Sequence, residues 1–235
     1  MESAESRQAM ESAGPVWAIV VAAGTGARFG GAKQFEQLRG RRVVDWSIAA
    51  SRAAADGVVV VVPADRVGDP TLAEGPSGPL SGKPGPSGPL SGKPVVVVAG
   101  GASRSGSVRA GLAVVPAEAG IVVVHDAARP FATLALFEAV VAAVRAGAAG
   151  AVPGVALSDT VKRVQEGRVV ATLDRAGLVA VQTPQAFAAA ALRKAHAAAG
   201  EATDDAALVE STGGRVMVVD GDPVNTKITY RQDLQ

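Results

Sequence analysis

The feature that most constrains the fold is a series of continuous, valine-rich apolar runs. They cover residues 16–21, 58–62, 95–98 and 121–124, and a fifth strand is expected over 151–155. A strand that is apolar on both sides fits a parallel sheet with helices on both faces. Apolar residues at helical spacing lie between the runs, in segments 43–55, 108–115 and 134–144. This alternation predicts an α/β fold with a Rossmann-like, mostly parallel, doubly wound sheet.

The pattern of alternating strands and helices changes after the fifth expected strand, which ends near residue 155. Segments 160–164 and 168–172 alternate polar and apolar residues around Gln165-Glu166-Gly167, which predicts an antiparallel hairpin that packs on another surface. The other elements expected in this half are a helix over 188–199, a short helix after Thr203, a strand over 215–219 and a last strand over 226–229.

Composition narrows the possible functions. Hydrophobic residues make up 48% of the 235, which is enough for a core and excludes global disorder. A net charge of +1 and an aromatic fraction of 3% argue against nucleic-acid binding. The absence of cysteine removes disulfides and thiolate metal sites, and two histidines leave little for a zinc site.

Targeting signals are also missing from the pattern. No apolar run is close to the length of about 18–20 residues that spans a bilayer, and the first 14 residues lack the regions of a signal peptide. We therefore expect a cytoplasmic protein with no membrane partner. Residues 1–14 are expected to form a frayed tail, and residues 15–235 a single domain.

An unusual segment interrupts this domain. Residues 75–94 contain Gly-Pro-Ser-Gly-Pro-Leu-Ser-Gly-Lys-Pro twice in tandem. Such a composition has almost nothing to bury, so we expect a disordered surface loop. The alternative is a proline-rich ligand for a partner domain, but no P-x-x-P motif with flanking aromatic or basic residues is formed.

Glycine-rich and charged segments follow the strand ends, where open parallel sheets bind ligands. In the loop Ala22–Lys33, glycines let backbone N–H groups approach a phosphate, while Arg28 and Lys33 supply positive charge. Its spacing matches neither a Walker A loop nor the dinucleotide fingerprint. The alternative is an ordinary glycine-rich turn with solvated basic side chains.

Two further segments leave their function open. Gly100–Ser107 could bind a ribose or a base through hydroxyls and helix-start amides, or it could be a flexible loop in which Ser103 or Ser105 caps the helix. Lys227, after Asn225 and Thr226 on the expected last strand, could be functional or an exposed edge lysine.

The segment His125–Pro130 follows the fourth buried run. Asp126 and Arg129 could orient a metal or a ribose and a phosphate, or they could form a simple ion pair with each other. His125 is interpreted as a satisfied side chain at the end of a strand.

Together these motifs resemble the 2-C-methyl-D-erythritol 4-phosphate cytidylyltransferases of the non-mevalonate isoprenoid pathway. The matching pieces are Ala22–Lys33, Gly100–Leu112, Val124–Pro130, Ser158–Arg163, Leu173–Arg175, Gln182–Gln185, Thr203–Asp205 and Asn225–Thr229. They occur in the order of the family and cover residues 16–234 apart from the insert. The resemblance implies a nucleotidyltransferase-type fold and transfer of CMP from CTP to methylerythritol phosphate, with release of pyrophosphate.

The resemblance also implies roles for individual residues. The catalytic residues would be Arg28, Lys33, Arg175 and Lys227. The nucleotide would be bound by Ala22, Ala23, Gly24, Gly26, Gly101, Ser107 and Asp126, and the acceptor by Arg129, Thr160, Thr183 and Thr203. Mg²⁺ would bridge phosphate oxygens, with Asp126 as its candidate protein ligand. No general base is expected, because the attacking phosphate is already ionised at neutral pH.

Family members are homodimers, which implies that the hairpin arm 156–175 reaches the partner's site and that Thr160 and Arg175 act in trans. The sequence departs from the family at Ala102, where many relatives carry an acidic residue, in the insert, and at the C-terminus, where relatives continue into a closing helix. The alternatives are a cytidylyltransferase for another polyol phosphate, such as ribitol 5-phosphate, and a binding protein without activity. The basic residues named above disfavour the latter.

Overall fold

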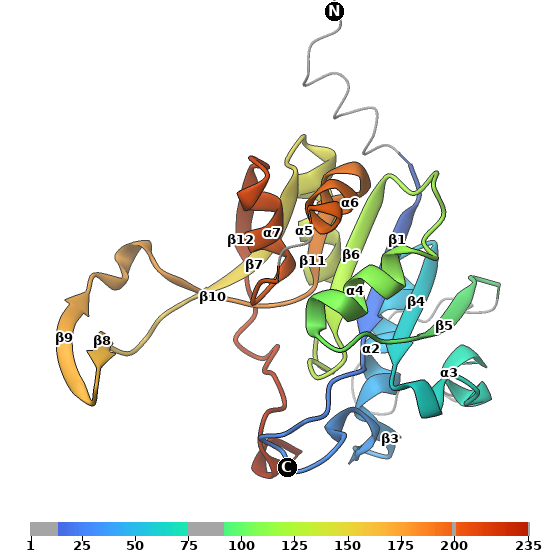
Figure 1. The fold of residues 1–235 in the computed structure, drawn as a ribbon, viewed down its shortest axis with the longest axis horizontal. Coiled ribbons are helices and arrows are strands. Elements are labelled where there is room, and N and C mark those ends of the chain that lie inside the picture. Colours follow the sequence, from blue (N-terminus) through green and yellow to red (C-terminus); the bar gives the residue numbers. More distant parts are fainter. Residues whose placement is uncertain (1–13, 75–91, 199–200, 235) are drawn as a thin grey trace, which may run out of the picture.

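The computed structural model describes residues 14–74, 92–198 and 201–234. The expectations for the tail before residue 14 and for most of the insert lie outside these residues. The described part contains a central sheet with helices on both faces (Figure 1). The strands of this sheet are β1 (Val16–Val21), β4 (Gly57–Val62), β5 (Val95–Ala99), β6 (Ile121–Asp126), β7 (Gly150–Ala156), β10 (Val179–Val181), β11 (Gln185–Ala188) and β12 (Val216–Asp220).

The other elements surround this sheet. The α-helices are α2 (Val43–Ala54), α3 (Pro70–Glu74), α4 (Arg104–Leu112), α5 (Leu134–Arg145), α6 (Ala189–Ala197) and α7 (Asp205–Ser211). Short 3-10 turns are η1 (Lys33–Phe35), η2 (Ala64–Arg66), η3 (Arg175–Gly177) and η4 (Arg231–Leu234), and β2 (Gln37–Leu38) pairs with β3 (Arg41–Arg42).

Strand β1 shows why the sheet carries two helix layers. Its alternate side chains enter two separate cores: Ala18 and Val20 pack in the core that contains residues of α2 and α5, whereas Trp17 and Ile19 pack in the core that contains residues of α4, α6 and α7. Because successive side chains of a strand point to opposite faces, a fully apolar strand must be covered on both sides. The predicted doubly wound α/β fold is thus confirmed.

The strand order creates a crevice beside β1. The path through the sheet is β10-β7-β11-β6-β1-β4-β5, and β12 also pairs with β7. After β1 the chain forms β4 and then β5 on one side of it, and then returns to form β6 on the other side. The pairs β1–β4, β4–β5 and β1–β6 are all parallel. The order therefore reverses between β1 and β6, and ligands of such sheets bind at the carboxyl ends of the strands at this point.

The structure differs from the sequence expectations in three places. Strands β10 and β11 were not expected; both are antiparallel to β7, and β11 is inserted between β6 and β7. The expected last strand over 226–229 does not form, because Ile228 N–H donates to the carbonyl of Ala128 in a loop rather than to a sheet neighbour. The expected burial of the third valine run was also wrong, since β5 is only half-buried at the edge of the described sheet.

The predicted hairpin is present as a separate ribbon that projects from the body of the molecule (Figure 1). It consists of β8 (Val161–Gln165) and β9 (Arg168–Leu173), joined through Glu166 and Gly167. Both linking residues have positive φ, 50° and 76°, as tight two-residue hairpin turns require. Among the described residues, no helix is long and apolar enough to span a membrane.

Candidate active site

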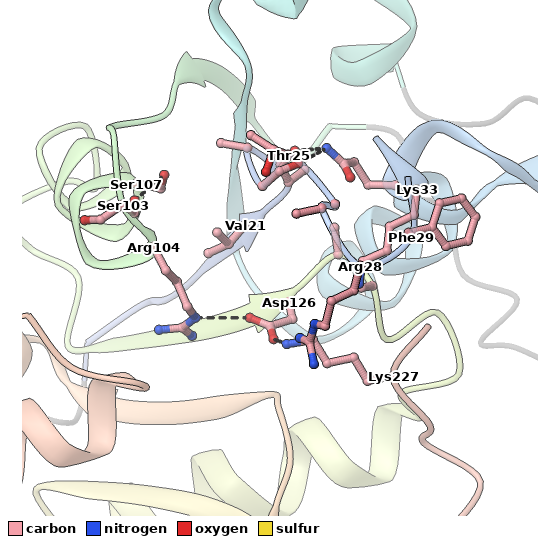
Figure 2. Close-up of a pocket in the computed structure, with 18 of the residues that line it drawn as sticks. Val21, Thr25, Arg28, Phe29, Lys33, Ser103, Arg104, Ser107, Asp126 and Lys227 are labelled. Atoms are coloured by element: carbon pink, nitrogen blue, oxygen red, sulfur yellow. Dashed lines mark hydrogen bonds and ion pairs between the residues drawn. The ribbon is translucent and has the colours of Figure 1, made fainter. Parts of the chain in front are cut away.

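A cavity of about 560 Å³ opens at the reversal point between β1 and β6. Its walls come from the loop after β1, the loop that leads from β5 into α4, the end of β6 and the segment around Lys227 (Figure 2). Of the residues predicted to bind the nucleotide or to act in catalysis, the cavity brings together Ala22, Ala23, Gly24, Gly26, Arg28, Lys33, Gly101, Ser107, Asp126 and Lys227.

The loop after β1 is shaped by one glycine and one buried glutamine. Gly26 has a φ of +65°, and a Cβ there would lie 1.8 Å from the carbonyl oxygen of Gly31, so only glycine fits. Gln34, which is buried, donates from Nε2 to the carbonyls of Ala22 (2.7 Å) and Gly24 (3.0 Å). The loop is therefore held open as a backbone cradle. The sequence analysis did not single out Gln34.

Three cations from distant parts of the chain share the cavity. Arg28 and Lys33 belong to the loop after β1, and Lys227 comes from the C-terminal segment. In Figure 2 they lie on one side of the cavity, opposite Ser103 and Ser107. Partial burial, together with the charges of Lys227 and Arg28, lowers the pKa of Lys33 from its ordinary value. This repulsion marks the place as suited to a polyanion, whose charge would relieve it.

Asp126, at the end of β6, is the one carboxylate among the described residues that line the cavity. Lys227 Nζ lies 2.5 Å from its Oδ2, and Arg104 Nε lies 3.4 Å from its Oδ1. Burial acts to raise the pKa of Asp126, but Lys227 and Arg104 outweigh it and hold that pKa far below its usual range. The carboxylate is therefore ionised at neutral pH. Lys227 is not an edge lysine of the sheet, because no strand forms over 226–229; its side chain is 38% exposed, lines the cavity and pairs with Asp126.

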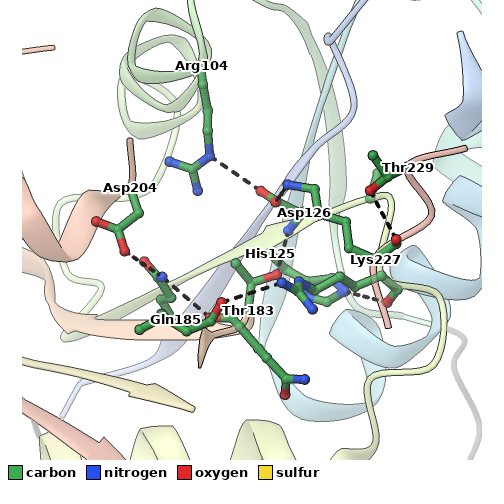
Figure 3. A network of polar contacts seen from close by, with 12 residues as sticks. Arg104, His125, Asp126, Thr183, Gln185, Asp204, Lys227 and Thr229 are labelled. Carbon is green, nitrogen blue, oxygen red and sulfur yellow. Dashed lines mark hydrogen bonds and ion pairs between the residues drawn. The ribbon is translucent and has the colours of Figure 1, made fainter. Parts of the chain in front are cut away.

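His125 and Thr183 fix the backbone of Asp126 from behind (Figure 3). His125 Nε2 is 3.2 Å from the carbonyl of Arg129, so Nε2 must donate. Burial lowers the pKa of His125 to about 4, which leaves the ring neutral and Nδ1 an acceptor. The Thr183 hydroxyl then donates to Nδ1 (3.2 Å) and accepts from the backbone N–H of Asp126 (3.0 Å). The interpretation of His125 as a satisfied strand-end side chain is confirmed.

Among the described residues, the ion pairs of Asp126 are with Lys227 and Arg104 and not with Arg129, so the alternative of a simple ion pair between Asp126 and Arg129 was wrong. Its Nη1 donates to the carbonyl of Asn225 at 2.8 Å, and its Nη2 lies 3.5 Å from the carbonyl of Val181. The side chain thereby ties the loop after β6 to the segment that carries Lys227. Its Nε is buried and has no hydrogen-bond partner among the described residues.

The loop that enters α4 forms the opposite wall. Ser103 caps the helix by accepting from Gly106 N–H, and Ser107 donates to the carbonyl of Ser103. A Cβ on Gly101 would come within 2.8 Å of the Gly106 backbone, so glycine is needed for this close turn. Arg104 also lines the cavity. Sequence reasoning missed Arg104, because its partners lie far away in the chain.

Five of the predicted residues do not line this cavity. Thr183 is buried behind Asp126. Thr203 is exposed before α7, and Thr160 and Arg175 are exposed at the base of the hairpin arm, where Arg175 donates to the carbonyl of Ser158. Arg129 is only part-buried beside the cavity. The roles predicted for these residues toward an acceptor remain predictions.

The cavity offers the Asp126 carboxylate as a ligand for a divalent cation. Among the described residues, no group of three or more histidine or acidic side chains could hold a metal by itself. Mg²⁺ is commonly bound by one or two carboxylates, with substrate phosphates and water completing the shell. Asp126 meets this need, because it is ionised and reaches the cavity. The residues present therefore fit a cation that arrives with a phosphate ligand.

Known proteins match this chain along most of its length. A family model for 2-C-methyl-D-erythritol 4-phosphate cytidylyltransferase matches residues 16–235. A protein of that name from Rhodococcus opacus is 44% identical over 232 residues, which is 95% of this chain and 94% of the relative. The bifunctional enzyme IspD/IspF of Clavibacter michiganensis is 45% identical over 221 residues, 92% of this chain but 52% of the relative.

The fold has the same relatives. The crystal structure of the 2-C-methyl-D-erythritol 4-phosphate cytidylyltransferase from Thermus thermophilus superposes with a TM-score of 0.70 and 32% identity, covering 92% of this chain and 94% of that one. The chain spans about half the length of the bifunctional relatives. It belongs to the 2-C-methyl-D-erythritol 4-phosphate cytidylyltransferase family.

Proposed function

We propose that this protein transfers CMP from CTP to 2-C-methyl-D-erythritol 4-phosphate, giving 4-diphosphocytidyl-2-C-methyl-D-erythritol and pyrophosphate. The observation that carries the proposal is the convergence of Arg28, Lys33 and Lys227 on one cavity at the reversal point of the sheet. Membership of the family supports the same reaction.

The nucleotide is expected to lie between the two glycine-containing walls. The backbone of the loop after β1 faces the triphosphate, and Arg28 and Lys33 supply the positive charge that holds it. The wall at the start of α4, with Gly101 and Ser107, faces the cytidine. Asp126 lies between the two walls, where a ribose or a phosphate-bound cation would meet it.

The chemical step needs placement rather than a covalent intermediate. An oxygen of the acceptor phosphate attacks the α-phosphorus of CTP, and the bond to the α–β bridging oxygen breaks, with its electron pair leaving on pyrophosphate. The nucleophile is already ionised, so no base is required. Lys33, Arg28 and Lys227 stabilise the charge that grows in the transition state. We propose that Asp126, together with the phosphates, would hold Mg²⁺, whose charge would neutralise part of the charge on the phosphates.

The acceptor is expected beside Lys227 and Arg129. Arg129 is part-buried beside the cavity, and its guanidinium would supply positive charge to the acceptor phosphate. We propose that the enzyme is a homodimer in which the arm brings Thr160 and Arg175 to the partner's acceptor pocket, because these residues do not line the cavity of their own chain. Both substrates are anions that do not cross membranes unaided, so we place the reaction in the cytoplasm.

Two substitutions test the proposed roles of the cations. Arg28→Ala and Lys227→Ala should each lower kcat by about 100-fold or more, as loss of a transition-state stabiliser does. The matched controls are Arg145→Ala and Lys194→Ala, which remove exposed charges at the ends of α5 and α6 away from the cavity. Turnover is followed by pyrophosphate release, with folding checked by circular dichroism.

The acceptor is tested in the same assay with ribitol 5-phosphate in place of methylerythritol phosphate. The proposal predicts a much higher kcat/KM for methylerythritol phosphate. A preference for ribitol 5-phosphate would assign the protein to another polyol phosphate.

For the substitutions, unchanged turnover in Arg28→Ala or Lys227→Ala would remove that residue from the mechanism.

A further inference from the structure

A buried acid–histidine pair lies behind the wall of the cavity, and the proposed chemistry does not use it. Asp205 begins α7 and His196 lies in the last turn of α6. The side chain of Asp205 is 0% exposed and that of His196 is 3% exposed. His196 Nε2 is 2.9 Å from Asp205 Oδ1 and donates to it, because a carboxylate only accepts.

Arg104 connects this buried pair to the cavity. Its Nη1 donates to the second oxygen of Asp205, Oδ2, at 2.7 Å. Its Nε faces Oδ1 of Asp126 at 3.4 Å (Figure 3). One guanidinium is thus shared between a carboxylate inside the protein and a carboxylate in the cavity wall.

The geometry makes the orientation of Asp126 depend on Asp205. Arg104 approaches Oδ1 of Asp126, whereas Lys227 binds Oδ2, so the carboxylate is held from two sides. A guanidinium is planar and offers several donors in a fixed arrangement, so binding Asp205 also sets the plane it presents to Asp126. A buried carboxylate without a cation is strongly unfavourable, which keeps Arg104 at Asp205.

We propose that Asp205 and His196 are positioning residues for the nucleotide half of the site. They fix Arg104, and Arg104 holds Asp126 in the orientation that a bound nucleotide requires. This inference rests on the proposed function, because it concerns the binding of CTP. It assigns the pair a larger effect on CTP affinity than on the acceptor, whose expected place is beside Lys227 and Arg129.

The test combines Asp205→Asn with a change at Arg104. Asp205→Asn keeps the shape of the side chain but removes its charge. It should raise the Kd of CTP, measured by calorimetry, by about 10-fold, with a smaller change in the KM of methylerythritol phosphate, as loss of a partner behind a ligand-binding group does. Arg104→Lys keeps the charge but has no fork to join both carboxylates, and should raise the Kd similarly. In the double variant, the two effects should not multiply.

Glu201→Gln is the matched control. Glu201 links the same parts of the chain, since its Oε1 binds Ser103 and Arg109 of the α4 region, but it is exposed and does not line the cavity. Its variant should change the Kd of CTP by less than about 2-fold. Unfolding temperatures are recorded for every variant; if Asp205→Asn does not fold, Arg104→Lys decides the question through the same split between CTP and acceptor.

The outcomes separate this inference from the proposed function. A wild-type protein that neither binds nor turns over CTP would overturn both. An active wild type in which Asp205→Asn and Glu201→Gln bind CTP equally well would overturn this inference alone. Multiplicative effects in the double variant would show that Asp205 does not act through Arg104 and would also overturn it.

Discussion

Lys33 lies among like charges, and this predicts how nucleotide binding depends on pH. Burial and the neighbouring cations lower its pKa, so it loses its proton at a lower pH than an ordinary lysine. In the proposed site, the protonated form binds the triphosphate. The affinity for CTP should therefore fall as pH rises through the range where Lys33 titrates, which lies below that of an ordinary lysine. Lys33→Arg keeps its charge throughout this range, so its affinity should stay level.

This prediction is measured by calorimetric titration of CTP at several pH values, in buffers of different ionisation enthalpy. The wild type should take up protons on binding at alkaline pH, because the triphosphate raises the pKa of Lys33. Parallel pH profiles for wild type and Lys33→Arg would show that Lys33 does not face the nucleotide.

His125 predicts a loss of stability in acid. Its folded pKa is about 4 against an unfolded value of about 6.5, so the unfolded state binds more protons between these values. The contribution of His125 to the free energy of unfolding is therefore full above about pH 6.5. It falls as pH decreases toward about pH 4 and does not change further below that. The contribution is on the order of 3 kcal/mol. Urea unfolding of wild type and His125→Gln across this range measures it.

His125→Gln keeps a donor for the Arg129 carbonyl but does not titrate. Groups away from His125 titrate equally in both proteins, and the neighbouring Asp126, held by Lys227 and Arg104, stays ionised in both folded proteins across this range. The difference between the two unfolding free energies therefore isolates His125. That difference should move in favour of the variant as pH falls. A difference that is constant with pH would mean that His125 has an ordinary pKa in the folded protein.

At the scale of elements, two cations are placed by one small hydrophobic cluster. Arg28 is followed by Phe29 and Lys227 by Ile228, and both apolar side chains are buried together with Leu38 and Val43. The loop after β1 and the C-terminal segment therefore share an anchor. Packing in this cluster sets the distance between the cations that flank the substrate.

Ile228→Ala should therefore affect activity as well as stability. It should cost about 2–5 kcal/mol of unfolding free energy, as truncation of a buried isoleucine does, and it should lower kcat/KM at a temperature where the variant remains folded. Ile48→Ala is the control, because Ile48 is equally buried in the core between α2 and the sheet. Comparable losses of stability with equal kcat/KM in both variants would contradict the anchor.

The same elements show what the sequence could predict. Valine-rich strands and the hairpin are local patterns, and their positions were confirmed to within a few residues. Strand β11 was missed because it is short and runs into α6 without turn residues. The strand expected at 226–229 does not form, because the backbone of Ile228 bonds to the loop after β6.

In the candidate site, too, some residues could be predicted from the sequence and others could not. The glycine loop and its cations are close together in sequence and were found, as was Asp126 at a strand end. Arg104 and Asp205 are 101 residues apart, and His196 acts only through Asp205. Contacts of this kind depend on which helices lie side by side, and composition and spacing carry no signal for them.

At the scale of the whole molecule, exposed apolar side chains support the proposed dimer. Val164, Val169 and Val170 are 52–61% exposed on the hairpin, and Met217 and Val218 are 45% and 54% exposed on β12. A two-stranded ribbon is marginally stable in water unless another surface covers it. A second copy of the chain would cover the arm and bring Arg175 to the other site.

Mixing two inactive variants tests this arrangement. Arg175→Ala and Lys33→Ala should each be inactive alone. If Arg175 acts in trans, one site of a mixed dimer contains both wild-type residues, so random subunit exchange should restore about a quarter of wild-type activity. No recovery after exchange has been verified by mass spectrometry would place Arg175 in the site of its own subunit.

The central claim is that this cavity joins the α-phosphorus of CTP to the phosphate of methylerythritol phosphate. ³¹P nuclear magnetic resonance of the purified protein with both substrates and Mg²⁺ observes that bond directly. We predict two new coupled resonances of a diphosphate diester, appearing in equal amount with free pyrophosphate, and none without the acceptor. Formation of CDP and a new phosphate ester would show transfer of the terminal phosphate instead, and an unchanged spectrum would show no transfer; either result would contradict the account.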